Sequence, residues 1–526
     1  MINRRILLGA AAASPFLSIP ALGQSGTSSV LKYVPASNLT VLDPVFTPAA
    51  VSVTHGYCVF DTLYGVDADQ NPQPQMASGH SVSDDGLEWR ITLRDGLTFH
   101  DGEPVRAQDC AASLARWAKV DPFGQALNDA TESFGHADDK TIVIKLTRPF
   151  GPLLNAIGKP HSRPAMMMPE RLAMTDPQTQ ITEMIGSGPF RFLADEYVSG
   201  DRVAYSKFTD YVPREGAPVW TSGGKQINFD RLEWKIIPDD ATAIAAIQAG
   251  EVDWLGSVLT DLRPILAAHP DVNLHRTDPF GLMHVIRFNH LNAPFDNVEL
   301  RRAVLKAVDQ VPFLQSVAAD PEDREECLSL FPCGTPGVEQ VGEGIVGSLD
   351  IEAAKQAVID AGYDGEPVVI LNPTDIASIH PHGLLAADLL EKIGFNVDLV
   401  ETDWGTVVQR RVSKESVENG GWNLAATNWP AISINNPATN ATTRGLGDSG
   451  WWGWYEDAEM EKMVVDWLGA ESDDAAAQLY LDVQKRAIDQ VPTLPLGLSY
   501  QSGAVRADLE GALQGSVDMF WNIKRS

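Results

Sequence analysis

One glycine-rich segment matches a cofactor-binding pattern, but its surroundings favour a loop. Residues 342–347 read G-x-G-x-x-G, the fingerprint of a dinucleotide-binding turn. Pro336 and Gly337 stand where that fold requires a strand, so we interpret the segment as a surface loop. The phosphate loop G-x-x-x-x-G-K-S/T and the motifs H-E-x-x-H and G-x-S-x-G are absent. The sequence therefore predicts no cofactor and no catalytic residue.

Two further patterns place potential ligands or acids side by side. His380 and His382 flank Pro381 and offer two imidazoles to a metal, but the proline fixes φ and no third ligand is evident, so an exposed loop is the alternative. Glu456 and Asp457 would suit a glycoside hydrolase only if two carboxyls faced one cleft. We assign no metal site from these patterns.

The tryptophans are concentrated in one part of the chain. Seven of the thirteen fall between Trp404 and Trp467, and Trp451, Trp452 and Trp454 lie within four residues among glycines. Side chains so close in sequence point in diverging directions, which makes their joint burial difficult. Packing in the core and a role in facing a ligand both remain open, because aromatic walls bury much area and keep a polar edge.

Four cysteines allow three pairings in an oxidising compartment. Cys327 and Cys333 bound a short loop next to Pro332 and Gly334 that a disulfide could close, and two buried thiols are the alternative. The other two cysteines lie in helical and strand-like patterns typical of small core residues, and no zinc-ligand spacing occurs.

The elements that must position these residues are of mixed type. Residues 91–94 and 141–146 alternate between apolar and polar types, and residues 109–119 form a helical pattern between them. Residues 231–237 form a strand, which leads to a helix capped by Asp239 or Asp240. This order predicts a mixed α+β region followed by a strand that leads into a helix.

Later segments predict helices packed on a parallel sheet. Asp296 or Asn297 can cap an amphipathic helix. Residues 367–371, 382–392 and 396–400 then form a strand, a helix and a second strand. Such a β-α-β unit makes its strands parallel, and ligands bind beyond the carboxyl ends of parallel strands.

Length and composition indicate a large globular protein. The 526 residues allow about three to four domains, and 44% hydrophobic with 21% charged residues is typical of packed domains. A net charge of −30 argues against a nucleic-acid-binding protein, which needs clustered Lys and Arg. No later segment approaches the roughly 18 apolar residues that a membrane-spanning helix needs.

The first residues read as an export signal. Arg4 and Arg5 precede an apolar stretch, and a small-x-small cleavage site ends the signal at residue 23. The paired arginines fit the twin-arginine route, and ordinary secretion signals also carry such pairs. The first cysteine, Cys58, lies too far downstream for a lipid anchor. We therefore expect a free periplasmic protein.

Several motifs in order carry a resemblance to a known family. They are Leu42-Asp43-Pro44, the segment 89–96 (W-R-I-T-L-R-D-G), 186–190 (G-S-G-P-F), Pro294-Phe295-Asp296 and 491–496 (V-P-T-L-P-L). Together they resemble the extracytoplasmic solute-binding proteins of the dipeptide, oligopeptide and nickel type, which serve ABC importers. The resemblance spans nearly the whole mature chain. It implies an α/β, two-lobed periplasmic-binding-protein fold of type II, with an extra domain and a hinge between the lobes.

The resemblance also implies domain boundaries. After the signal peptide, residues 1–23, the first lobe is discontinuous, the extra α+β domain packs on it, and the second lobe binds ligand. The corresponding ranges are 24–57 with 190–282 and 492–526 for the first lobe, 58–189 for the extra domain and 283–491 for the second lobe.

The residues that clamp a dipeptide in this family do not occur at the corresponding positions of this sequence. Dipeptide-binding members hold the amino terminus with an aspartate a few residues after a tryptophan. With Trp429 as that tryptophan, Ile432 or Ser433 takes the place of the aspartate. The arginine that holds the carboxylate falls near Ala377 or Ser378. A buried ammonium without a partner costs several kcal/mol, so the usual binding mode of a dipeptide is in doubt.

The function implied is capture of a peptide-like or other small polar or aromatic solute by hinge closure, and its delivery to an ABC permease in the inner membrane. We expect a monomer that binds no nucleic acid. A secreted carbohydrate-active hydrolase and a receptor for a metal complex or haem on the same fold are the alternatives. The residues that we expect in the pocket are His55, Tyr57, His380, Trp404, Asn428, Trp429, Ser433, Asn435, Trp451 and Trp452.

Overall fold

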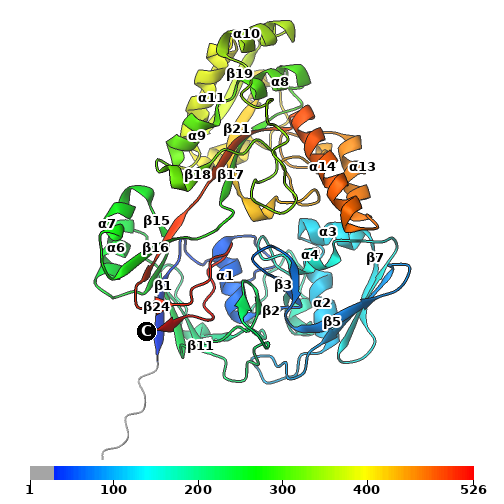
Figure 1. Ribbon diagram of the computed structural model, residues 1–526, viewed down its shortest axis with the longest axis vertical. Helices are drawn as coiled ribbons and strands as arrows, with labels where there is room; N and C mark the ends of the chain where they lie inside the picture. Colours follow the sequence, from blue (N-terminus) through cyan, green and yellow to red (C-terminus); the bar gives the residue numbers. More distant parts are fainter. Residues whose placement is uncertain (1–28) are drawn as a thin grey trace, which may run out of the picture.

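Two sheets, one above the other in Figure 1, form the centres of two lobes. This computed structural model describes residues 29–526, so the expected signal peptide and the expected mature start at Gln24 lie outside the described residues. The proximal lobe is the part built on the seven-stranded sheet, and the distal lobe, residues 282–499, is built on the six-stranded sheet. A four-stranded sheet within residues 60–189 forms the middle domain, which adjoins the proximal lobe.

Most strands of the three sheets run in an order that differs from their sequence order. The seven-stranded sheet is β10 (Phe190–Phe192), β11 (Arg202–Lys207), β14 (Arg231–Lys235), β1 (Val30–Val34), β15 (Trp254–Val258), β23 (Ser502–Arg506) and β16 (Val272–Arg276). The six-stranded sheet is β18 (Arg324–Glu325), β22 (Thr493–Ser499), β17 (Leu282–Phe288), β21 (Leu424–Pro430), β19 (Pro367–Pro373) and β20 (Asn396–Thr402). The four-stranded sheet is β5 (Ala77–Val82), β6 (Glu88–Leu93), β8 (Thr141–Leu146) and β7 (Thr131–His136). Short two-stranded pairs are β2 (Asp61–Thr62) with β9 (Met166–Met167), β3 (Tyr64–Val66) with β4 (Pro72–Pro74), β12 (Pro218–Val219) with β13 (Ser222–Gly223), and β24 (Leu509–Glu510) with β25 (Lys524–Arg525).

The helices cover these sheets. Those of the proximal lobe and middle domain are α1 (Ala50–Val59), α2 (Ala107–Trp117), α3 (Pro122–Asp129), α4 (Leu153–Gly158), α5 (Glu170–Ala173), α6 (Asp240–Gln248) and α7 (Arg263–Ala267). Those of the distal lobe are α8 (Val298–Ala307), α9 (Gln310–Val317), α10 (Ile351–Asp360), α11 (His380–Lys392), α12 (Trp404–Arg410), α13 (Ala458–Leu468) and α14 (Asp473–Gln490).

Several local signals read from the sequence produce the expected elements, whereas the strand-like pattern at Cys58 is wrong because this residue lies in α1. Strand β14 buries Leu232 and Trp234 in alternation, and the Asp239 side chain caps α6 by accepting from the Thr242 N–H. Asn297 caps α8 in the same way. The predicted β-α-β unit is confirmed, because β19 and β20 pair in parallel and α11 connects them.

Within residues 29–526, the chain crosses between the lobes twice. Residues 277–281 connect β16 to β17, and residues 500–501 connect β22 to β23. The expected return to the first lobe at residue 492 is too early, since β22 pairs with β17 in the distal sheet. The Val-Pro-Thr-Leu-Pro-Leu motif thus supplies a central distal strand, because its buried apolar side chains complete that lobe's core. Such short crossings suit a hinge, because a few loop residues can absorb the changes in φ and ψ when the lobes close.

Candidate ligand-binding cleft

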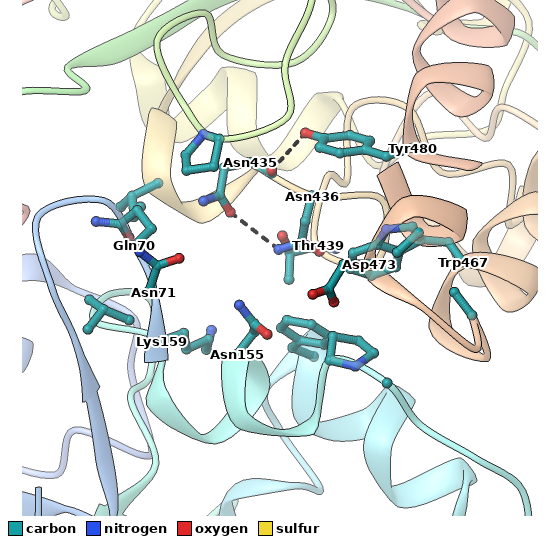
Figure 2. A pocket seen from close by; sticks show the side chains of 18 of the residues that line it. Gln70, Asn71, Asn155, Lys159, Asn435, Asn436, Thr439, Trp467, Asp473 and Tyr480 are labelled. Atoms are coloured by element: carbon teal, nitrogen blue, oxygen red, sulfur yellow. Dashed lines mark hydrogen bonds between the residues drawn. The ribbon is translucent and has the colours of Figure 1, made fainter. Parts of the chain in front are cut away.

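The large cavity lies where the distal lobe meets the middle domain. Its volume is about 460 Å³, and both parts of the molecule contribute to its walls. Figure 2 shows amide and aromatic side chains that converge on it from the two sides. A cavity with a few convergent polar groups and aromatic walls is the usual form of a small-molecule site.

A hairpin loop of the middle domain supplies one wall. The loop between β3 and β4 is closed by Asp67, whose Oδ1 accepts from the backbone N–H groups of Asp69 and Asn71. This turn holds Gln70 at a left-handed φ of 65°, a conformation that costs a non-glycine residue about 1 kcal/mol or more. Gln70 lines the cavity, and its buried Nε2 has no hydrogen-bond partner among the described residues.

The segment around α3 and α4 forms the floor. Asp121 caps α3 by accepting from the N–H groups of Phe123 and Gly124, and it also pairs with the ammonium of Lys159. Burial lowers the pKa of Lys159, and the adjacent carboxylate offsets this effect. Asn155 on α4 points from this floor toward the distal lobe, where its amide can both donate and accept.

The distal lobe supplies the opposite wall. Asn436 Oδ1 accepts from the Thr439 N–H at 3.1 Å, which folds a turn that presents Asn435 and Asn436 to the cavity. Tyr480 on α14 donates its hydroxyl to the Asn435 carbonyl at 2.7 Å, which fixes this turn against the helix. The buried Thr439 hydroxyl has no partner within residues 29–526. Unused donors on both walls are what a polar solute would satisfy.

The two walls are in contact, so the cleft is closed. His161 Nδ1 of the middle domain lies 3.2 Å from the Ser433 hydroxyl of the distal lobe. The Gly151 N–H donates to the Leu468 carbonyl at 2.9 Å, and the rings of Phe123 and Trp467 stack with centroids 6.3 Å apart. Burial lowers the pKa of His161 to about 4, so the imidazole is neutral at pH 7 and the contact requires no charge.

Two of the expected pocket residues line this cavity, and the two from the first lobe do not. Ser433 and Asn435 lie on its distal wall. His55 and Tyr57 are buried in the proximal core, where His55 Nδ1 contacts the Tyr205 hydroxyl at 2.8 Å and the Tyr57 hydroxyl donates to the Pro160 carbonyl at 3.0 Å. Their helix, α1, is buried on nearly all sides, so both side chains contribute to packing.

The expected tryptophans pack mainly on one another and on cations. The Trp429 and Trp451 rings lie 5.5 Å apart, and the Arg411 guanidinium lies about 5 Å from the rings of both Trp404 and Trp452. This cluster belongs to the packing of the distal lobe and not to the lining of the large cavity. Glycine at position 453, with a φ of 92°, lets neighbouring tryptophans turn to the same cluster.

The remaining expected site residues are engaged elsewhere in the distal lobe. His380 Nε2 contacts Glu401 at 2.9 Å, and the Asn428 amide donates to the Ser378 hydroxyl at 3.2 Å. The expected exposed loop at His380–His382 is wrong, because these residues form the first turn of α11, where His382 is fully buried. No group of three or more potential metal-ligating side chains occurs within residues 29–526. Asp457 caps α13 and pairs with Arg486 at 2.6 Å, so the suspected acid pair does not line the cavity.

The two loop interpretations correspond to observed features. Residues 342–347 form turns with no preceding strand, as the interpretation of that segment as a loop predicts. Cys327 and Cys333 are joined by a disulfide, and the loop that follows brings Pro336 to the cavity.

Sequence reasoning missed several cavity residues. Gln70, Asn155 and Trp467 lie in separate segments and were not nominated. The run of turn-forming residues from Asp67 to Pro72 could have drawn attention to the hairpin loop, since exposed loops on a rigid scaffold often carry function. Trp467 belongs to the tryptophan-rich region 404–467, for which a ligand-facing role is one of the two expectations, whereas no local signal marks Asn155.

Two lobes that are joined by two short crossings, with a cavity between the distal lobe and the middle domain, define a hinged solute-binding protein. No helix among the described residues is long and apolar enough to cross a membrane.

Comparison with known proteins identifies the family. Residues 71–451 match the family described as bacterial extracellular solute-binding proteins, family 5 Middle, and the chain belongs to this family. The chain is 36% identical, over all of both sequences, to a probable peptide ABC transporter periplasmic-binding protein, y4tO, of Sinorhizobium fredii. The expected resemblance is thus confirmed.

Solved structures share the fold. The ABC transporter substrate-binding protein CtaP of Listeria monocytogenes superposes with a TM-score of 0.78 at 19% identity, covering 95% of this chain and 99% of its own. A dipeptide-binding protein of Pseudoalteromonas sp. SM9913, in complex with Met-Leu, gives a TM-score of 0.75 at 21% identity, covering 94% and 100%. These likenesses confirm the expected two-lobed α/β fold.

Proposed function

We propose that this chain is a monomeric periplasmic receptor of an ABC importer, which captures a peptide-like or other small polar or aromatic solute and delivers it unaltered to the permease in the inner membrane. The observation that carries the proposal is the cavity of about 460 Å³ between the distal lobe and the middle domain, which adjoins the proximal lobe. A ligand that contacts both lobes binds the closed state more tightly than the open one, so binding shifts the population toward closure. The importer can then distinguish loaded from empty receptor.

The cavity chemistry favours a solute with several hydrogen-bonding groups. Gln70, Asn155 and Thr439 offer donors and acceptors, and Trp467 offers a ring on which a flat or apolar group can lie. The full-length relative is described as a probable peptide-binding protein, which supports a peptide-like solute. Ile432 lines the cavity near the position of the usual clamp aspartate, so the binding mode would differ from that of the usual dipeptide clamp.

A thermal-shift screen against peptides, opines, sugars and metal chelates tests the proposal. A bound solute raises the melting temperature by mass action, so the active class identifies itself. Calorimetry on the purified protein then gives the affinity, and mass spectrometry of the recovered solute checks that it is unchanged. Turnover of a glycoside or peptide, or a screen in which no class stabilises the protein, would refute the proposal.

A matched pair of variants locates the site. Gln70→Ala removes an unpartnered donor from the cavity and should weaken binding about fivefold, the equivalent of about 1 kcal/mol for one hydrogen bond. Gln178→Ala is the control, because Gln178 is exposed on the middle domain and lies outside the cavity lining. Equal affinities for the two variants would place the ligand elsewhere.

A further inference from the structure

A second, smaller cavity lies at the hinge. Its volume is about 150 Å³, which corresponds to roughly five water molecules. Its lining combines the proximal lobe, the first crossing segment, the middle-domain residue His161, and Leu282 and Pro430 of the distal lobe. His161 borders this cavity while its contact partner Ser433 borders the large one, so the two cavities lie on opposite sides of that contact.

Two carboxylates line the hinge cavity without a cationic partner. Asp278, in the crossing segment, accepts from the backbone N–H of Phe280 at 2.9 Å. Asp518 accepts from the hydroxyl of Tyr33 through Oδ2. Within residues 29–526, no lysine, arginine or histidine forms an ion pair with either aspartate. Both carboxylates are half-buried, so a cation that enters the cavity would gain two partners of opposite charge.

Other polar groups in the same cavity also lack partners. Thr54 is 4% exposed and His161 is 6% exposed, and both border the cavity. Neither the Thr54 hydroxyl nor His161 Nε2 makes a hydrogen bond to the described chain, and the buried Ser516 hydroxyl has no partner either. The cavity therefore offers two carboxylates, two hydroxyls and one imidazole nitrogen, a set dominated by acceptors.

The backbone at Gly256 packs closely against the hydrogen-bonded pair of Tyr33 and Asp518. A Cβ atom on Gly256 would lie 2.5 Å from the Tyr33 hydroxyl and 3.1 Å from Asp518 Oδ2. Only glycine leaves room for this pair. Burial raises the pKa of Tyr33 well above its usual value, so the phenol stays protonated and donates to Asp518.

The charged groups nearest the hinge do not neutralise the cavity. Arg276 stacks on Tyr500, with its guanidinium carbon 3.6 Å from the ring centroid, and donates to the Glu322 carbonyl at 2.6 Å. Tyr500 donates to Glu325 at 2.6 Å. None of these three side chains borders the cavity.

We infer that the hinge cavity binds a primary ammonium group of a captured solute, held by Asp278 and Asp518. An ammonium has three donors and fits a small space bounded by acceptors. The inference rests on the proposed function, and it replaces the missing clamp aspartate with two carboxylates from other segments. Because Asp278 lies in a crossing segment, a cation bound there contacts the hinge itself.

The first test needs no knowledge of the solute. Butylammonium chloride is the probe, with butanol and sodium or potassium chloride as matched neutral and ionic controls. Butylammonium should raise the melting temperature of the wild-type protein more than any control, and this excess should vanish in Asp278→Asn/Asp518→Asn. The control variant Asp364→Asn, which changes an exposed aspartate outside both cavities, should keep it. An equal shift with sodium or potassium chloride, or no excess over butanol, overturns the inference.

The second test uses any peptide that the thermal-shift screen finds. Acetylation of its amino groups should weaken binding at least about tenfold, and the double aspartate variant should lose a similar factor for the free peptide but not for the acetylated one. If the peptide binds equally well with and without its amines, the ammonium inference fails while the receptor proposal stands. If no compound of the screen binds, the receptor proposal fails and the butylammonium comparison decides the inference alone.

Discussion

His161 and Ser433 lie 272 residues apart in the sequence, yet His161 Nδ1 is 3.2 Å from the Ser433 hydroxyl across the cleft. His161 is fixed in the middle domain and Ser433 follows β21 of the distal lobe, so this contact exists only when the lobes are closed. It also lies between the large cavity and the hinge cavity. The pair is therefore a direct reporter of closure.

His161→Ala and Ser433→Ala should each shift the protein toward the open state. Loss of one net hydrogen bond, about 1 kcal/mol, changes the ratio of closed to open molecules about fivefold. Small-angle X-ray scattering of the ligand-free protein should show a larger radius of gyration for both variants. The double variant should be no more open than the single ones, and additive effects would show that the two residues act independently.

The buried ion pair between Asp43 and Arg116 should be a main stabiliser of the junction between the proximal lobe and the middle domain. Arg116 Nη2 lies 2.7 Å from Asp43 Oδ2, and both side chains are almost fully buried. Arg116→Met leaves the carboxylate without its partner and should lower the free energy of unfolding by about 3–5 kcal/mol. Urea denaturation measures this change.

Arg90→Met is the matched control for that variant. Arg90 pairs with Glu88 on the surface, where an ion pair contributes about 1 kcal/mol or less. A loss for Arg116→Met as small as that for Arg90→Met would show that the junction does not depend on the buried pair.

The Cys327–Cys333 disulfide should stabilise the distal lobe. It closes the loop 327–333, and the segment that follows this loop brings Pro336 to the large cavity. The Gln310 side-chain amide donates to the Cys327 carbonyl at 2.9 Å. Cys327→Ser/Cys333→Ser should lower stability by about 2 kcal/mol, because the unfolded chain regains the entropy of a short open loop. A reductant should lower the melting temperature of the wild type, and an equal effect on the variant would contradict this role.

The acid dependence of stability should report on the hinge cavity. Burial raises the pKa of both Asp278 and Asp518 to about 6, whereas an unfolded aspartate ionises near pH 4. Between about pH 4 and 6 the folded protein therefore binds more protons at these sites than the unfolded chain, and their contribution to stability falls as the pH rises.

The double variant Asp278→Asn/Asp518→Asn lacks both carboxyls, so its stability should not show this fall as the pH rises. The melting temperature of the variant relative to the ligand-free wild type should rise from pH 4 to 6 and stay level above it, as scanning calorimetry can measure. A difference that does not change with pH would mean that the two carboxyls titrate as they do in the unfolded chain.

Local patterns were sufficient for much of the fold. The alternation of apolar and polar side chains predicted β14, and Asn297 marked the start of α8. The order strand, helix, strand predicted the parallel pairing of β19 with β20. These features depend on neighbours within a few residues, so a single sequence contains them. The ordered motifs likewise sufficed to suggest the family.

The residues of the candidate site could not be predicted from local patterns, because they come from segments far apart in the sequence. Gln70, Asn155 and Trp467 face one cavity because a hairpin turn, a floor helix and α13 meet across two lobes, and His55 is excluded because α1 is enclosed by the proximal core. Asp278 and Asp518 meet at one cavity for the same reason, although 240 residues separate them in the sequence. The sequence by itself determined the elements, the family and the hinged class of protein. The tertiary structure alone decided which side chains remain unpartnered in the cleft, because that depends on long-range packing and on how the lobes close.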